Sequence, residues 1–142
     1  MVCRNCSWID YKNPLPVAVC VAVNERGEIL ITRRNIEPGY NKWALPGGFI
    51  EANENPEKAC LRELKEETGV RGEINRLAGV YVQTTRKYGS LLIIGYVVRA
   101  LGEDILLNDE LKEAKFFAFE NIPFIPFASH RKILENISRG RQ

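Results

Sequence analysis

Residues 48–70 read GFIEANENPEKACLRELKEETGV and contain the start and stop signals of one helix. Asn55 stands where a side chain can cap the first turn, and Pro56 follows with a backbone angle that suits the first helical position. Gly69 can take the left-handed conformation that ends many helices. We therefore predict a helix that begins at Pro56 and ends at Thr68.

The predicted helix carries several carboxylates on one face. Because residues three and four apart are neighbours on a helix, that face holds Glu63, Glu66 and Glu67. One interpretation is a solvent-exposed charged face, which is the common meaning of glutamates at this spacing. However, three like charges repel one another unless a cation lies among them, and clustered carboxylate oxygens suit Mg²⁺ or Mn²⁺. Arg62 lies beside this face, four residues before Glu66, and is placed to hold that carboxylate.

Apolar runs on both sides of this helix predict the strands of a sheet. They span residues 15–23, 28–32, 74–83, 91–100 and 115–119, with a brief strand at 43–46 and a second helix at 129–138. Since residues 24–27 form a turn signal, we expect the first two strands to pair as a hairpin. The arrangement predicts an α/β fold, namely an α/β/α sandwich with a mixed sheet between helices.

Composition and charge limit the class of protein further. The chain has 142 residues, which fits one domain, and its net charge of +2 argues against a strongly basic nucleic-acid-binding protein. No apolar run approaches the ~20 residues that cross a bilayer, and the first residues lack the apolar core of a secretory signal. Four cysteines are ordinary usage for a reducing compartment. We expect a cytoplasmic protein that binds neither membrane nor nucleic acid.

The acidic stretch resembles the signature of a known family. Its fixed positions read Gly48-x5-Glu54-x7-Arg62-Glu63-Leu64-x-Glu66-Glu67-x-Gly69-Val70. They match the signature of the MutT-like Nudix hydrolases, G-x5-E-x7-R-E-U-x-E-E-x-G-U with U aliphatic, at every position. The resemblance covers nearly the whole chain, so we expect a Nudix domain at residues 14–142 after an N-terminal extension at 1–13.

The resemblance implies an activity and a site. Nudix enzymes are metal-dependent hydrolases that cleave the pyrophosphate bond of a nucleoside diphosphate linked to another group. Glu63, Glu66 and Glu67 resemble the ligands of Mg²⁺ or Mn²⁺, with the carbonyl of Gly48 as a further ligand. Arg62 resembles the arginine that orients these glutamates. Glu66 and Glu67 are both candidates for the general base, and the choice between them stays open.

Two features outside the signature resemble NADH-pyrophosphatase-like members of the family. Glu110 is similar to an acid that completes the metal site, with its neighbour Glu113 and a plain charged loop as alternatives. Cys3 and Cys6 form half of a zinc-ribbon pattern, which needs two cysteine pairs to supply four ligands. The second pair is missing, so we do not expect zinc at Cys3 and Cys6.

These motifs define the substrate less closely than they define the reaction. Candidate substrate-binding residues are Arg34, Trp43, Arg86 and Tyr88, of which the arginines suit phosphates and the aromatic rings suit stacking or core packing. The expected partner is a nucleotide-derived small molecule, and we favour ADP-ribose, FAD or a dinucleotide. The alternatives are a housecleaning pyrophosphohydrolase of (deoxy)nucleoside triphosphates and a non-catalytic Nudix domain that senses a nucleotide. The family often forms homodimers, so a homodimer is among the expected assemblies.

Overall fold

Strand β1 lies at the centre of a mixed sheet in the computed structural model, which describes residues 4–6 and 13–140. In chain order the elements of this part are β1 (Leu15–Val23), β2 (Ile29–Arg34), β3 (Trp43–Ala44), β4 (Gly47–Phe49), α1 (Pro56–Thr68), β5 (Gly72–Thr85), β6 (Gly89–Ala100), β7 (Leu111–Phe117), the short 3-10 helix η1 (Phe119–Asn121) and α2 (Ala128–Gly140). No helix in the described ranges is long and apolar enough to span a membrane.

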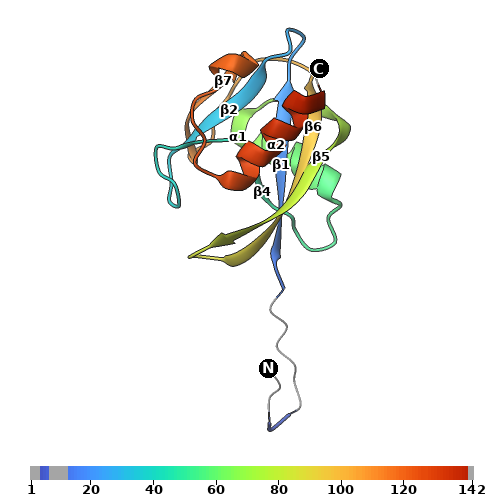
Figure 1. Ribbon diagram of the computed structural model, residues 1–142, viewed down its shortest axis with the longest axis vertical. Helices are drawn as coiled ribbons and strands as arrows, with labels where there is room; N and C mark the ends of the chain where they lie inside the picture. The colour runs from blue at the N-terminus through green and yellow to red at the C-terminus, as the bar shows by residue number, and fades with distance from the viewer. Residues whose placement is uncertain (1–3, 7–12, 141–142) are drawn as a thin grey trace.

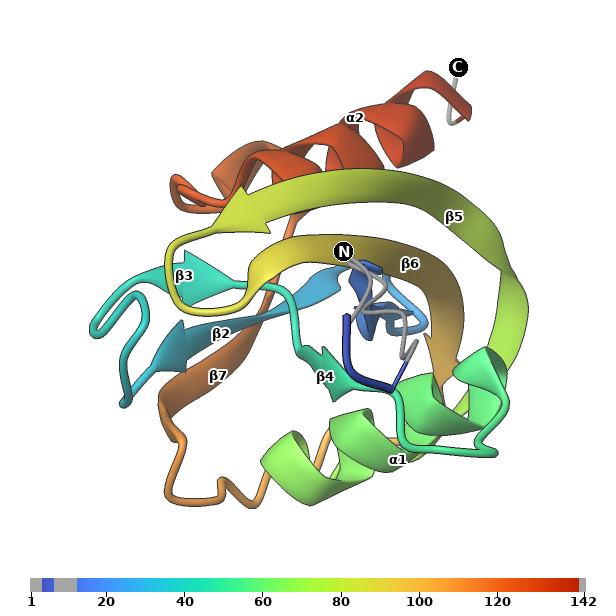
Figure 2. The same ribbon diagram turned by 90° about the horizontal axis from the view of Figure 1, so that it is seen from below.

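The sheet has the strand order β3-β2-β1-β6-β5, with β4 also paired to β1 and β7 to β2. β1 and β6 are parallel over the whole length of β1, whereas β5 and β6 form a long antiparallel ladder. Helix α2 covers one face of this sheet and α1 the other (Figures 1 and 2). The predicted α/β/α sandwich with a mixed sheet is therefore confirmed.

The two faces of β1 bury different side chains. Val19 and Val21 point into the core under α2, where they join Ile133 of that helix. Cys20 and its small neighbours Ala18 and Ala22 point into the second core, under α1. The continuous apolar run of β1 thus reflects burial on both faces, as is typical of a strand in a parallel pair.

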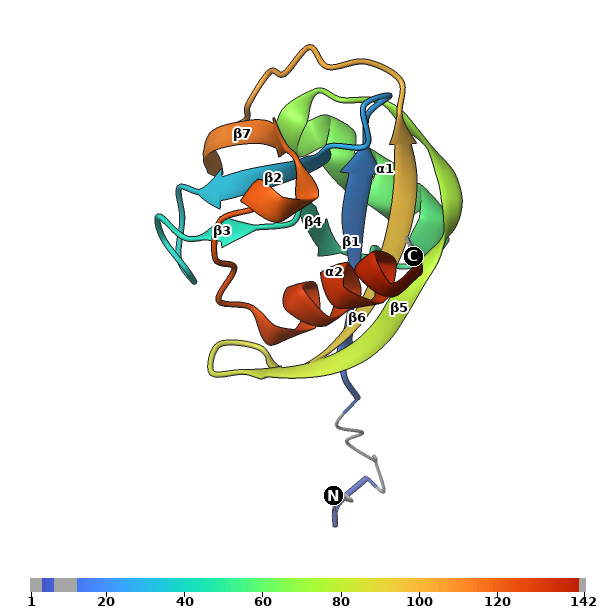
Figure 3. The same cartoon turned by 45° about the horizontal axis from the view of Figure 1, so that its top comes forward.

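The second edge of β1 is divided among several partners. Val17 to Val19 pair with β4, and the N–H of Cys20 donates to the carbonyl of Pro46 at 2.8 Å. β2 meets β1 only where Val23 lies opposite Ile29, and its long partner is β7. The predicted antiparallel hairpin is confirmed, and its ladder has a single residue pair. β2 and β3 diverge from β1 as a result (Figure 3).

Strand β4 was not predicted, because the pair Gly47-Gly48 reads as the end of a brief strand. In the structure these glycines begin β4, since they allow a close approach to β1. A Cβ on Gly47 would lie 2.3 Å from the carbonyl oxygen of Ala18. β7 is also corrected, because it begins at Leu111 and ends at Phe117, while Phe119 belongs to η1.

Candidate active site

Helix α1 is fixed at both ends by the signals seen in the sequence. The side chain of Asn55 accepts a hydrogen bond from the N–H of Glu57 at 3.1 Å, and Pro56 occupies the first turn. Gly69 has a φ of 76° and donates its N–H to the carbonyl of Lys65 at 2.8 Å. The predicted bounds of the helix are therefore confirmed, and the positions of its glutamates are set by local structure.

The packing of α1 decides where the carboxylates lie. Cys60 and Leu64 are completely buried in the core between α1 and the sheet. Burial of a leucine side chain contributes about 1.5–3 kcal/mol, so this contact fixes the rotation of the helix about its axis. The carboxylates of Glu63 and Glu67 consequently lie next to the two glycines of β4.

Glu67 is the most deeply buried of the three glutamates, with only 6% of its surface exposed. The N–H of Gly47 donates to its Oε2 at 3.4 Å. Burial raises the pKa of Glu67 to about 8, and the neighbouring charge of Glu63 adds to this rise. A positive charge placed next to Glu67 would favour the ionised carboxylate and lower this pKa.

Glu63 lies directly against Gly48. A Cβ on Gly48 would be only 2.4 Å from the carboxyl carbon of Glu63, so glycine is needed for this side chain to lie where it does. Burial raises the pKa of Glu63, while its ion pair with Arg62 opposes the rise. A small residue at position 48 therefore leaves room at the β4 backbone for the carboxylate.

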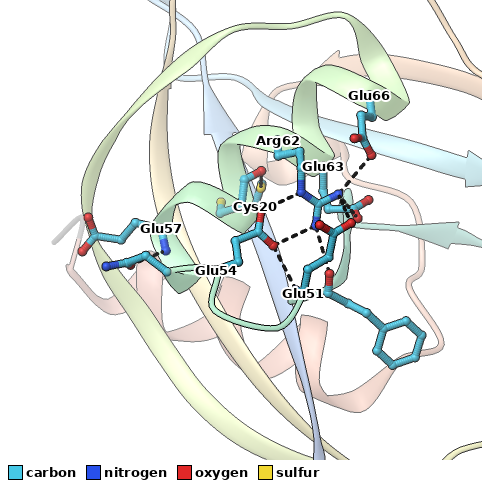
Figure 4. Close-up of polar contacts among 10 residues, drawn as sticks. Cys20, Glu51, Glu54, Glu57, Arg62, Glu63 and Glu66 are labelled. Carbon is cyan, nitrogen blue, oxygen red and sulfur yellow. Dashed lines mark hydrogen bonds and ion pairs between the residues drawn. The ribbon is translucent and has the colours of Figure 1, made fainter.

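Arg62 connects the acidic residues of the site (Figure 4). Its Nε and Nη2 atoms donate to both oxygens of Glu54, at 2.7 and 3.0 Å, and Nη2 also reaches the carbonyl of Phe49 at 3.1 Å. Its Nη1 donates to Glu63 at 2.9 Å and to Glu66 at 3.1 Å. The bonds from Arg62 hold the pKa of Glu54 at about 2. Arg62 is thus anchored on one side and orients two glutamates on the other.

Glu63, Glu66 and Glu67 form an acidic wall whose oxygen atoms fit a hard divalent cation. Glu66 has 57% of its side chain exposed, whereas Glu63 has 16%, so the carboxylates run from solvent to the interior. Within the described residues no three acidic, histidine or cysteine side chains converge as a metal cluster, and Glu63 and Glu66 are turned toward Arg62. Carboxylate oxygens beside a glycine backbone are nevertheless the ligand types that Mg²⁺ and Mn²⁺ prefer. The residues present therefore fit such an ion.

A cavity of about 510 Å³ opens beside the acidic wall. Glu63, Glu66 and Glu67 line it, together with Gly48 and Glu110. The charge of Glu110 contributes to the raised pKa values of both Glu63 and Glu67, so Glu110 is near both of them. Glu113 instead lies 3.8 Å from Arg33 on the neighbouring strand.

The substrate-binding candidates divide into two groups. Arg34 and Tyr88 line the cavity, and Tyr88 packs edge-on against Phe49 with ring centroids 5.0 Å apart. In the part of the chain that the structure describes, Trp43 and Arg86 are not among the lining residues. Trp43 packs edge-on against Phe117 of β7, with centroids 5.5 Å apart. Lys87 lines the cavity in the place where Arg86 was expected to contribute.

Gln83 and His130 are polar residues of the cavity that were not predicted as site residues. The Oε1 of Gln83 accepts hydrogen bonds from the N–H of Ser129, at 3.3 Å, and from its hydroxyl group. The Nδ1 of His130 accepts from the N–H of Leu45 at 3.1 Å. Burial, with a smaller effect of Arg34, lowers the pKa of His130 to about 4. His130 is the one histidine in the sequence, and that was the only signal that could have drawn attention to it.

The zinc prediction lies partly outside the described residues, which do not include Cys3. Cys6 is exposed and free. Cys20 and Cys60 are buried under α1, where the thiol of Cys20 donates to the carbonyl of Cys60 at 2.9 Å. Burial raises the pKa of Cys20 well above its usual value, so this thiol is a packing group.

Comparison with known proteins gives one consistent set of relatives. The family model described as the NUDIX domain matches residues 13–137. The chain is 36% identical over 126 residues to an ADP-ribose pyrophosphatase of Methanocaldococcus jannaschii, which is 88% of this chain and 74% of that protein. A MutT-like protein of Streptomyces ambofaciens is 47% identical over 66 residues, or 46% of this chain and 41% of its own length. The crystal structure of a NUDIX hydrolase from Nitrosomonas europaea matches with a TM-score of 0.84 at 30% identity, covering 99% of this chain and 80% of that one.

Proposed function

The chain belongs to the Nudix family of hydrolases and is a pyrophosphohydrolase, and we propose that its substrate is a nucleoside diphosphate linked to another group, with ADP-ribose as the first candidate. The observation that carries this proposal is the pair of Glu63 and Glu67, partly or fully withdrawn from solvent at the wall of a cavity of about 510 Å³. A cavity of that size suits a nucleotide-sized ligand. The similarity to an ADP-ribose pyrophosphatase supports the choice of candidate.

We infer that Glu63, Glu66 and Glu67, with the carbonyl of Gly48, hold Mg²⁺ or Mn²⁺. The inference is supported by the hard oxygen donors and by the position of Glu67, which is buried at the wall of the cavity. When bound, such a cation supplies positive charge to the phosphate oxygens and makes a bound water more acidic. Glu110 is our candidate for a further ligand, because it lines the same cavity, whereas Glu113 is near Arg33.

Other residues of the chain orient the metal ligands or bind the substrate. Arg62 fixes the carboxylates of Glu63 and Glu66 through two hydrogen bonds from one nitrogen. Arg34 and Lys87 are placed at the cavity to meet substrate phosphates, which is supported by their positive charge and by their position in its lining. Glu66 and Glu67 are the two candidates for the group that takes the proton from the attacking water.

The proposal is tested by incubating the purified chain and Mg²⁺ with a panel of substrates and identifying the products. The panel contains ADP-ribose, FAD, NADH, dinucleoside polyphosphates, sugar nucleotides and nucleoside triphosphates. We expect release of a nucleoside monophosphate from at least one diphosphate-linked compound. The Glu67→Gln variant should lower the rate by roughly 10²–10⁴-fold, the usual range for loss of a proton-transfer group, and loss of the charge at a metal ligand has the same direction. Glu57→Gln, an exposed glutamate of the same helix that does not line the cavity, is the matched control and should leave the rate unchanged.

Three outcomes would change the proposal. Turnover of triphosphates alone would favour the housecleaning function. Nucleotide binding without release of any product would favour a sensing domain. Equal rates for Glu67→Gln and Glu57→Gln would remove Glu67 from the chemistry. A cytoplasmic setting and a homodimer stay predictions, and size-exclusion chromatography with light scattering tests the latter.

A further inference from the structure

The part of the cavity next to the start of α2 differs from the acidic wall. Its surface is formed largely by apolar side chains, namely Leu45, Leu91, Ile93 and Phe127. Gln83 and His130 are polar residues within this apolar surface. A pocket of this kind holds a flat, largely apolar group and orients it through a few polar contacts.

The hydrogen bond at Nδ1 determines which nitrogen of His130 carries the proton. A backbone N–H can only donate, so the Nδ1 that faces the N–H of Leu45 at 3.1 Å must be an acceptor. A neutral imidazole has one acceptor and one donor, and burial keeps the pKa of His130 low enough for the neutral form at pH 7. The Nε2 atom of His130 is therefore an N–H donor.

The orientation of the Gln83 amide is fixed by the same logic. Its Oε1 accepts from the backbone N–H of Ser129, and a flipped amide would place an NH₂ group against that N–H. The hydroxyl of Ser129 also donates to Oε1. The oxygen of Gln83 is thus occupied, and the NH₂ group is the end that is free to bind a ligand.

Neither free nitrogen is fully buried, and both residues line the cavity. In the described part of the chain no fully buried side-chain nitrogen or oxygen lacks a hydrogen-bond partner, so the unpaired Nε2 atoms of Gln83 and His130 must reach accessible surface. The two residues line one cavity, and Gln83 accepts hydrogen bonds from Ser129, the residue before His130 in α2. Neither atom can accept a hydrogen bond. The positive charge of Arg34 acts on His130, so it also favours a ligand that presents hydrogen-bond acceptors to this region.

We propose that Gln83 and His130 form a donor-only pair that selects a 6-oxopurine base, as in guanosine or inosine diphosphate derivatives, over adenine. The O6 and N7 atoms of a 6-oxopurine are adjacent acceptors, which two donors can meet together. A glutamine that recognises adenine needs both its oxygen and its nitrogen, because N7 accepts and the N6 amine donates. Here the oxygen is engaged by Ser129, so the N6 amine of adenine would face donors only. This inference rests on the proposed reaction, and it replaces the adenine of the first candidate, ADP-ribose, by a 6-oxopurine base.

The experiment compares ADP-ribose with IDP-ribose, which carries hypoxanthine in place of adenine and is otherwise identical. We expect kcat/KM for IDP-ribose to be roughly tenfold higher or more, since each bidentate base contact discriminates by about 1–3 kcal/mol. In Gln83→Glu the carboxylate still accepts from Ser129 but cannot donate, so the preference should fall to parity or reverse. Thr84→Glu, which adds the same charge at the exposed neighbouring position of β5, should keep the preference.

The histidine is tested by a rescue pair. The amide of glutamine reaches the position of Nε2 and can donate from its nitrogen, so His130→Gln should keep a preference for IDP-ribose. Phenylalanine cannot donate, so His130→Phe should lose it. If Gln83→Glu and His130→Phe leave the ratio of kcat/KM as it is in the natural chain, the donor-only pair does not read the base.

Binding of the product nucleotides separates this inference from the proposed function. Isothermal titration with IMP and AMP requires no turnover, and IMP should bind roughly tenfold more tightly. Tighter binding of IMP without any cleavage would reject the proposed function and support the base preference. Cleavage of both compounds, with equal or tighter binding of AMP, would support the function and reject the base preference.

Discussion

The two ends of the cavity are built in opposite ways. The acidic wall comes from one helix and the turn before it, so that Glu54, Arg62 and Glu66 lie within 13 residues of one another in the sequence. The end near α2 combines Leu45, Gln83 and His130, which come from three distant parts of the chain. One end depends on local helix geometry, and the other depends on the assembled sheet.

This difference assigns the chemistry to one end of the cavity and the choice of substrate to the other. A helix presents its carboxylates at a spacing set by its own hydrogen bonds, so the charged wall changes little when distant parts of the fold shift. The other end is held by backbone N–H groups of α2 and of the segment between β3 and β4, so its donors are oriented only after the fold is complete. We expect mutations at the first end to affect the chemistry and those at the second to affect the choice of substrate.

Arg62→Lys is the variant that should disturb the orientation of the acidic wall most strongly without changing its charge. Lysine cannot form the two-pronged bond to Glu54 and also reach Glu63 and Glu66 from the same side. We expect activity to fall by roughly 10–100-fold and the Mg²⁺ concentration for half-maximal rate to rise, as is usual when a group that orients metal ligands is lost. Arg71→Lys, at an exposed position, is the control. An unchanged metal requirement in Arg62→Lys would contradict the orienting role.

Glu110 tests how far the acidic wall extends beyond α1, because it is the one candidate metal ligand that comes from a distant segment. Glu110→Gln should lower the rate by about tenfold and raise the metal requirement, as expected for a contributing but not essential ligand. Glu113→Gln should do neither, since Glu113 lies near Arg33. Metal titrations of the two variants provide the comparison. Equal effects of both would show that net charge, rather than a specific ligand, is responsible.

The smallest effect concerns stability at the α2 end. The pKa of His130 falls from about 6.5 in the unfolded chain to about 4 in the folded one, so below pH 6.5 the unfolded state binds more protons. The stabilising contribution is complete above pH 6.5 and is lost as the pH falls toward 4. Urea unfolding should therefore show a steeper loss of stability between pH 6.5 and 4 in the natural chain than in His130→Asn. Parallel curves would show that His130 is not held in its neutral form.

The acidic wall was largely predictable because its signals are local. Asn55, Pro56 and Gly69 mark the ends of α1, and its glutamates follow from helical periodicity and from the Nudix signature. The sandwich was predictable too, since apolar runs identify β1, β5 and β6 as strands, of which β1 and β6 are largely buried. The metal roles assigned to the glutamates stay predictions until they are tested.

The remainder depends on contacts between distant residues. Nothing in the local sequence around β2 indicates that its long partner is β7 rather than β1. The aromatic ring of Trp43 suits stacking on a base, yet the register of β3 with β2 places it against Phe117. Gln83 and His130 have ordinary neighbours in the sequence, and only the folded chain reveals which of their atoms are free.

The divided edge of β1 has a consequence for how such a chain can diversify. Because β2 leaves β1 after a single residue pair, strand pairing opens a space between them, and the cavity lies along it. Exchanges at positions such as Gln83, Phe127 or His130 can therefore alter which molecule fits while the backbone and the acidic helix stay in place. A fold organised in this way can acquire new substrates one side chain at a time and keep the same reaction throughout.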